Sequence, residues 1–182
     1  MKFKKPLIFA AFLSIFALHL SAQENPHLKI AFGLNVIDNS NDKQGPWAIH
    51  TLDFNTPFFL GADYQVNQKW SFGVNTSFNK LKVLGVESSF FSMNADANYY
   101  FVSNASRTFI DFYGILGGGF YNAFDNTAVT INPGLGFNYW FSSNLGVNVT
   151  AKGNFAVNKD VPEVRNYYQY NLGLIWRLGE GF

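Results

Sequence analysis

The sequence predicts an all-β fold, an eight-stranded antiparallel up-and-down transmembrane β-barrel, and three observations support this prediction. Eight segments alternate large apolar with small polar residues at period two, the repeat of a strand whose two faces meet different surroundings. Aromatic residues are abundant, with 21 Phe, 9 Tyr and 4 Trp in 182 residues, whereas charged residues make up only 14%, against about 25% in soluble domains. The connections between the segments alternate between short and long.

The N-terminal residues 1–22 are predicted to be a secretory signal peptide, which leaves 23–182 as the barrel domain. Lys2, Lys4 and Lys5 precede an apolar run over 7–18 that closes on Leu20-Ser21-Ala22, the order of a signal and its cleavage site. The alternative, an N-terminal membrane anchor, is disfavoured because the run is shorter than the roughly 20 residues that span a bilayer.

The strands follow one another along the rest of the chain, and most approach the roughly 9 to 11 residues with which a tilted strand crosses a bilayer. No apolar run near 18 residues follows residue 28, so no membrane helix is expected. The predicted strands are residues 28–36, 58–66, 70–78, 91–101, 110–116, 135–141, 145–155 and 168–178, of which 110–116 alternates most weakly. Pro133 cannot donate to a ladder, so 128–133 is expected to hold a bulge or to stand above the membrane.

The connections suggest which side each end of the barrel faces. Short connections are expected at 67–69, 103–107 and 142–144, and long ones at 38–56, 80–90, 117–127 and 158–166. Short periplasmic turns opposite longer outer loops are typical of outer-membrane barrels. A soluble up-and-down barrel has no reason to sort its connections in this way.

Alternation alone does not say which face is inside, because a soluble lipocalin-like barrel would place its large apolar residues inward. The polar face is made of Gly, Ser, Asn, Gln and Thr, with few Lys and Glu. Small uncharged groups suit the crowded interior of eight strands, whereas a solvent-facing strand would be coated with charge. We therefore expect the apolar face to meet lipid.

Aromatic residues gather where the strands should cross the membrane interfaces, as in the girdles of outer-membrane barrels. The girdle beside the short turns is predicted to contain Tyr64, Trp70, Tyr99, Phe101, Tyr139, Phe141 and Trp176, and Phe58, Phe78, Phe91, Phe155 and Tyr168 lie beside the long connections. The alternative is that these residues reflect only the general β propensity of aromatic side chains.

Six charged residues fall on the predicted lumen face, three acidic and three basic. Because an unpaired charge in a narrow interior is costly, we expect them to pair across the lumen and to close it. The predicted network is Lys29, Asp63, Asp96, Asp111, Lys152 and Arg177. Alternatively, the long stems of Lys29 and Arg177 could carry their charges into headgroup water.

The last strand ends with alternating Tyr170, Leu172, Leu174 and Trp176, and the chain ends at Phe182. This pattern resembles the C-terminal signal by which outer-membrane barrels are recognised for assembly. Together with the signal peptide and the sorted connections, residues 28–182 resemble the small outer-membrane β-barrels of the outer membrane protein A transmembrane class. No residues follow Phe182, so the peptidoglycan-binding domain of the full-length family, and with it wall anchoring, is not expected.

The resemblance implies an integral protein of the bacterial outer membrane, in contact with outer-membrane lipid and lipopolysaccharide and inserted by the barrel assembly machinery. A structural or adhesive surface role without catalysis is expected. The alternatives are a small-solute channel or a barrel that binds an extracellular ligand through 38–56, 80–90, 117–127 and 158–166. No basic patch suggests nucleic acid.

The sequence offers little for catalysis or cofactor binding. The absence of cysteine excludes disulfides, thiolate metal sites and a cysteine nucleophile, and neither a metal nor a cofactor is expected. An outer-membrane lipid-modifying enzyme would need a set such as His50, Asp53 and Ser40, whose spacing matches no motif. The glycines at 114 and 117–119 lack the following Lys-Ser/Thr of a phosphate loop.

Overall fold

The structure, a computed structural model, describes residues 26–38, 52–53, 55–83, 86–103, 109–158 and 166–178. Its strands are β1 (His27–Asp38), β2 (Leu52–Asp53), β3 (Asn55–Gln65), β4 (Trp70–Val83), β5 (Val86–Val102), β6 (Ile110–Ala123), β7 (Asn126–Trp140), β8 (Leu145–Ala156) and β9 (Asn166–Leu178). The predicted signal peptide 1–22 lies outside the described residues and stays a prediction.

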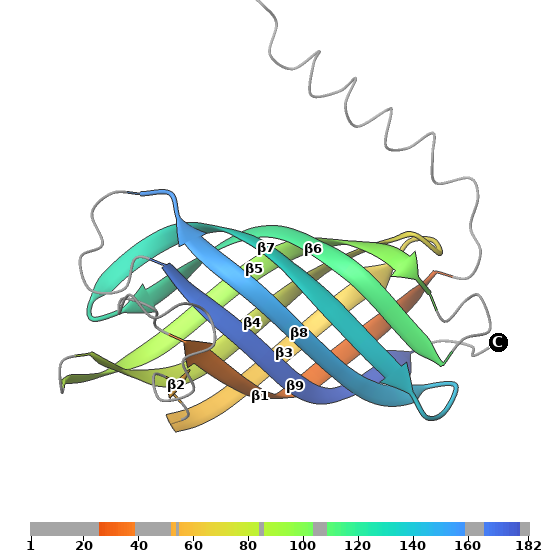
Figure 1. Ribbon diagram of the computed structural model, residues 1–182, viewed down its shortest axis with the longest axis horizontal. Coiled ribbons are helices and arrows are strands. Elements are labelled where there is room, and N and C mark those ends of the chain that lie inside the picture. Colours follow the sequence, from red (N-terminus) through yellow and green to blue (C-terminus); the bar gives the residue numbers. More distant parts are fainter. Residues whose placement is uncertain are drawn as a thin grey trace, which may run out of the picture.

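The strands form one closed antiparallel barrel (Figure 1). β1 pairs with β3, each later strand pairs with the next along the chain, and β9 returns to pair with β1. The described residues therefore confirm the eight-stranded up-and-down barrel. The sequence did not reveal β2, which pairs two residues with the end of β1. No helix in the described ranges is long and apolar enough to cross a bilayer.

The register determines the width of the barrel. A path of opposed residues leaves β1 at His27, passes Gln65, Ser71, Asn98, Ile115, Gly134, Lys152 and Gln169, and returns to β1 at Ile37. The return point lies ten residues beyond the start. With eight strands this stagger corresponds to a strand tilt of about 40° and a lumen just wide enough for side chains to fill.

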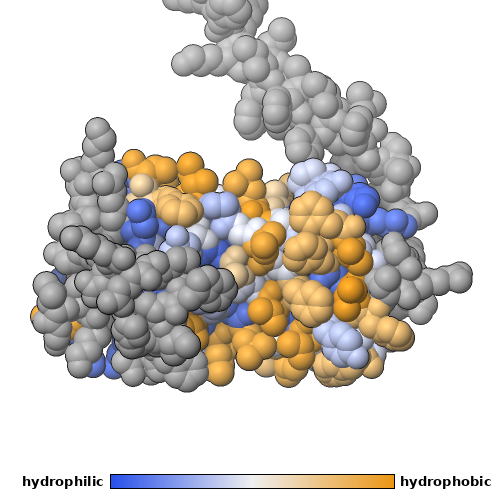
Figure 2. Space-filling view, in the orientation of Figure 1, coloured by the Kyte–Doolittle hydropathy of each residue, from blue (hydrophilic) through white to orange (hydrophobic). Residues whose placement is uncertain are grey.

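The outer surface carries a continuous apolar belt, part of which is visible in Figure 2. In β9 the outward apolar series runs from Tyr168 to Leu178. Ten steps of about 3.3 Å, tilted by about 40°, make this belt about 25 Å tall, the height that outer-membrane barrels present to lipid. Leu172, near its middle, is 56% exposed. The large apolar residues of the alternating segments therefore face outward.

The two ends of the barrel differ, and two of the expected long loops are strands. The turn end holds the beginning of β1, the end of β9 and the short turns at 66–69 and 141–144. The loop end, at the left of Figure 1, holds β2, the end of β8 and the beginning of β9. Within the expected loops 80–90 and 117–127, residues 80–83, 86–90, 117–123 and 126–127 lie in strands. β4 and β5 continue to Val83 and Val86, and β6 and β7 to Ala123 and Asn126, as paired extensions of the barrel.

The alternation is inverted in these extensions, which is why the sequence pattern seemed to end there. In the apolar belt, polar residues point inward and apolar residues point outward. In the extensions, Leu81 and Phe90 point inward and are buried, while Lys80 and Ser89 point outward and are exposed. This is the pattern of a sheet that stands in water around an apolar core. The extensions therefore rise beyond the lipid belt.

The hairpin between β6 and β7 turns on two residues with positive φ, Phe124 at 51° and Asp125 at 58°. Ala123 and Asn126 pair directly across it. Positive φ at both central residues is the geometry of a type I′ turn, whose twist matches that of the flanking strands. Asp125 is exposed at the tip, and Phe124 packs inward against the buried core of the extensions.

Pro133 lies inside β7, and the bulge, one of the two alternatives predicted for 128–133, is absent from this part of the strand. Its partner in β6 is Leu116, and the register toward β8 is the same on both sides of it. The pairing with β8 is interrupted at Asn132 and Pro133 only. Proline has no N–H to donate, so the sheet accommodates it by omitting ladder pairs and keeps its register.

The lipid belt predicts a depth-dependent cost for charge on one face of β9. Leu172→Arg, near the middle of the belt, should lower the free energy of unfolding by about 2–4 kcal/mol. Leu178→Arg, on the same strand and face but at the turn end, should cost about 0–1 kcal/mol. Urea unfolding in lipid vesicles measures both. Equal penalties at the two depths would contradict the assignment of this face to lipid.

Candidate functional site

The lumen is the part of the described structure where polar and charged side chains gather, and glycines make room for its larger groups. A Cβ at Gly33 would overlap the Cα of Gly173, its partner across the β1–β9 seam. The ring of Phe59 approaches Gly173, and the ring of Tyr113 covers Gly136 in the same way. Larger residues at these glycines would push the rings or the seam apart.

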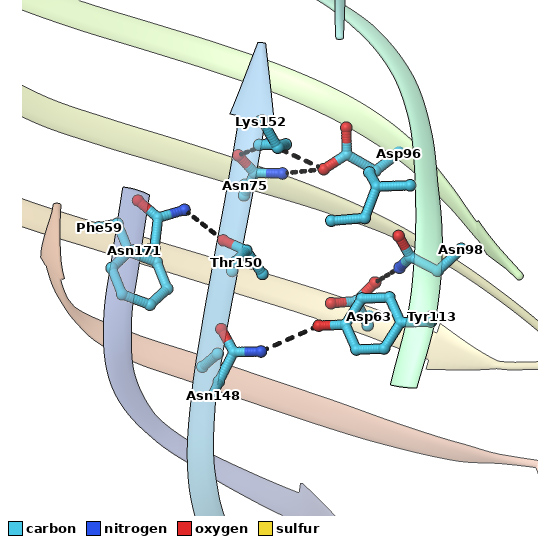
Figure 3. Close-up of a pocket in the computed structure, with 13 residues that line it drawn as sticks. Phe59, Asp63, Asn75, Asp96, Asn98, Tyr113, Asn148, Thr150, Lys152 and Asn171 are labelled. Carbon is cyan, nitrogen blue, oxygen red and sulfur yellow. Dashed lines mark hydrogen bonds and ion pairs between the residues drawn. The ribbon is translucent and has the colours of Figure 1, made fainter. Parts of the chain in front are cut away.

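An ion pair crosses the middle of the lumen. Lys152 of β8 places its Nζ 3.0 Å from Oδ2 of Asp96 on β5, and both side chains are almost fully buried. Asn75 of β4 joins them, because its Oδ1 accepts from Lys152 at 2.9 Å and its Nδ2 donates to Asp96. Figure 3 shows the three side chains converging from three strands. The pair is therefore both charge-balanced and hydrogen-bonded.

A second polar group lies nearer the turn end. Asp63 accepts a hydrogen bond of 2.7 Å from Nδ2 of Asn98, which also lies 3.1 Å from the hydroxyl of Ser71. Across the lumen Asn148 donates to the hydroxyl of Tyr113 at 2.9 Å. Asp63 is thus hydrogen-bonded to an amide side chain, an arrangement that the sequence pattern did not predict.

A cavity of about 40 Å³ lies between these groups and the ion pair, lined by residues that include Phe59, Asp63, Asp96, Tyr113 and Lys152 (Figure 3). A buried water needs about 10–15 Å³ of such space. The cavity therefore has room for about three water molecules.

Aromatic rings hold the charges at the turn end. Asp111 accepts hydrogen bonds from Nε1 of Trp140 at 2.8 Å and from Nδ2 of Asn138 at 2.9 Å. The guanidinium of Arg177 lies 4.3 Å from the centroid of a ring of Trp140. Such a cation–π contact is worth more where the cation is desolvated, and Arg177 is buried.

Lys29 has an aromatic partner at the same end. Its Nζ donates to the hydroxyl of Tyr100 at 2.8 Å and lies 4.5 Å from the centroid of that ring. The structure thus places all six predicted lumen charges inside the barrel. It brings Asp96 and Lys152 together as a pair and sets Lys29 and Arg177 against Tyr100 and Trp140. Trp140 was missed, although it shares the parity of the inward Asn138.

The predicted girdle residues lie on the outer surface. Tyr64, Trp70, Tyr99, Phe101, Tyr139, Phe141 and Trp176 are each 38–53% exposed, and all lie near the turn end. The ring centroids of Trp70 and Tyr99 are 5.0 Å apart, and those of Tyr99 and Phe101 are 5.5 Å apart. In β9, Tyr170, Leu172, Leu174 and Trp176 share the outward face. Phe182 lies outside the described residues, so the assembly signal stays a prediction.

The residues considered for catalysis are not placed as a site. His50 and Ser40 lie outside the described residues, and of Asp53 only the backbone, in β2, is described. Within the described ranges no three His, Cys, Asp or Glu residues lie together in a way that could hold a metal ion.

Comparisons with known proteins place the fold. No protein-family model and no curated protein matches the chain. The outer membrane protein OprG from Pseudomonas aeruginosa is 13% identical and superposes with a TM-score of 0.62 over 85% of this chain and 96% of its own. Neisserial surface protein A is 13% identical, with a TM-score of 0.59 over 83% of this chain and 96% of its own.

A third solved structure is the Yersinia pestis outer membrane protein Ail in a phospholipid bilayer nanodisc. It is 17% identical, with a TM-score of 0.51 over 85% of this chain and all of its own. At these identities the likeness is one of fold. The fold is that of the small integral outer-membrane β-barrel proteins. The apolar belt of this chain has the height of the band that such barrels present to lipid.

The buried pair in the lumen predicts a non-additive response to mutation. Asp96→Asn or Lys152→Met alone leaves one charge buried without its partner and should lower the free energy of unfolding by about 3–5 kcal/mol. The double variant removes both charges and should recover most of that loss. Urea unfolding of the four proteins in lipid vesicles gives the coupling energy. Additive losses would mean that the two groups do not interact.

Proposed function

We propose that this protein is a non-catalytic outer-membrane barrel with a closed lumen, whose structural or adhesive role is carried by the surface at its loop end. The observation that carries the proposal is the filling of the lumen. Asp96 and Lys152 are paired across it, Trp140 is buried at the turn end, and the cavity between measures about 40 Å³. A barrel of this kind offers its partners an outer surface instead of a passage.

The loop end is the end proposed to face the exterior. Its paired extensions rise beyond the belt with polar residues such as Lys80 and Asn122 on the outside. The turn end, by contrast, has short turns close to the girdle. The belt itself supports contact with outer-membrane lipid and the lipid part of lipopolysaccharide. Cleavage of the signal 1–22 and insertion by the barrel assembly machinery belong to the same proposal.

A labelling experiment tests the orientation. Because the chain has no cysteine, Asp125→Cys at the loop end and Ser143→Cys at the turn end give single labelling sites, and both positions are exposed. In intact cells a membrane-impermeant maleimide should label Asp125→Cys and should reach Ser143→Cys only after the outer membrane is opened. The reverse pattern would place the short turns outside.

The competing function, a small-solute channel, is favoured only by the polar lining of the 40 Å³ cavity. Planar-bilayer recordings distinguish the two, because a lumen filled by side chains should give no steady conductance. We expect the purified barrel to leave the bilayer silent or to open only briefly. A wide, steady pore in the unmodified protein would overturn the proposed closed barrel and support transport.

A further inference from the structure

The lumen ends, at the loop end, in a cluster of apolar side chains that is larger than the two apolar clusters further inside, one of Ala31, Phe59, Trp140 and Ile175 and one of Tyr100, Tyr113 and Ile115. We call it the outer cluster. Its buried members are 0–3% exposed and are Ile37, Leu81, Phe90, Tyr121, Ala123, Ala128 and Tyr167, with Phe124 and Ala156 packed against them. Every barrel strand except β3 contributes to it. The cluster therefore spans the lumen from wall to wall.

Three aromatic rings form its centre. The ring centroids of Phe90 and Tyr121 are 5.8 Å apart, and Tyr167 meets both edge-on, with its centroid 5.3 Å from each of theirs. Phe90 and Tyr121 come from adjacent strands, whereas Tyr167 comes from β9, three strands further round the barrel. The rings therefore meet across the lumen.

In several strands, the inward-facing residues change from polar to apolar between one inward position and the next. Moving two residues along the inward face, Asn79 gives way to Leu81 on β4, Ser92 to Phe90 on β5 and Gln169 to Tyr167 on β9. On the outward face of the same level, Ser89, Asn122 and Asn166 are exposed and polar. The outer cluster thus lies at and beyond the edge of the lipid belt, between the polar lumen and the exterior.

The layer just inside the cluster has polar groups that need water. Oδ1 of Asn132, both side-chain polar atoms of Asn154 and Oε1 of Gln169 are buried without a protein partner, and in the outer cluster the same holds for the hydroxyl of Tyr167. Buried polar groups of this kind are usually satisfied by internal water. An apolar constriction, by contrast, excludes water and ions by dewetting. The boundary between a wettable lumen and the exterior therefore falls at the outer cluster.

We propose that the outer cluster, and not the Asp96–Lys152 pair, is the permeability barrier that closes the lumen toward the exterior. The inference rests on the proposed function, which puts the loop end outside and the lumen closed. In this proposal the ion pair stabilises the barrel, and the three aromatic rings keep water and ions from passing between the lumen and the exterior.

Single-cysteine accessibility tests the proposal. Ser92→Cys puts a thiol at a fully buried position, one inward step below Phe90. In intact cells its reaction with a small cationic methanethiosulfonate should be slow. Adding Phe90→Ala or Tyr121→Ala should raise the rate about tenfold or more, because the constriction then wets. Leu81→Asn, which changes polarity at nearly constant size, should have the same effect.

Two control variants separate the seal from other effects. Phe91→Ala removes the same ring one residue along, from the outward face, and should leave the rate unchanged. The double variant Asp96→Asn with Lys152→Met should also leave it unchanged. Heat-dependent mobility on detergent gels shows whether each variant is folded. If an alanine variant does not fold, Leu81→Asn still tests the constriction.

The outcomes distinguish this inference from the proposed function. Rapid labelling of Ser92→Cys in the otherwise unaltered protein, or a steady pore in the bilayer, would overturn the closed barrel itself. The seal would be supported if the unaltered barrel gives no steady conductance, Ser92→Cys is labelled slowly in it, and the Phe90, Tyr121 and Leu81 variants are labelled faster. Folded outer-cluster variants that stay protected, or exposure of Ser92→Cys in the double ion-pair variant, would overturn it.

Discussion

The need to satisfy every backbone N–H and C=O inside lipid is the constraint on which this structure depends. Each group left unpaired in hydrocarbon costs several kcal/mol, so a sheet can cross a membrane only if its edges join. Here the joint is the β1–β9 seam, paired from Leu28–Leu178 to Asp38–Tyr168. The close approach at that seam explains the facing Gly33 and Gly173. Pro133 shows how small a gap in the ladder the closed barrel tolerates.

Closure with eight strands also determines what the lumen can be. Its width leaves space for side chains and a cavity of about 40 Å³, so nearly every inward residue is part of a packed interior. Charges in such an interior need partners, and Asp96, Lys152 and Asn75 supply them to one another. At the turn end, the rings of Tyr100 and Trp140 contact Lys29 and Arg177, and the carboxylate of Asp111 attracts both cations. Beyond the belt, where the outward face meets water, the interior becomes the apolar core of the outer cluster.

The sequence predicted the fold and its faces because a single physical rule governs the belt: apolar outward, small and polar inward. The same rule hid the strand extensions, since Phe90 and Tyr121 obey the opposite rule above the membrane and made 80–90 and 117–127 look like loops. The sequence also could not predict which acidic residue pairs with which basic residue across the lumen. That Lys152 meets Asp96 depends on a stagger of ten residues around the barrel, which no local pattern records.

The central claim is that the first and last barrel strands join in register. Disulfide cross-linking tests it directly, because the chain has no native cysteine. Leu34 and Leu172 are direct partners across the seam, and Leu174 is opposite Phe32 instead. In the membrane-inserted protein, Leu34→Cys with Leu172→Cys should form a disulfide under mild oxidation, because directly opposed residues lie within bonding reach. Leu34→Cys with Leu174→Cys should form far less. No cross-link in the first pair, or equal yields in the two, would contradict the closed barrel.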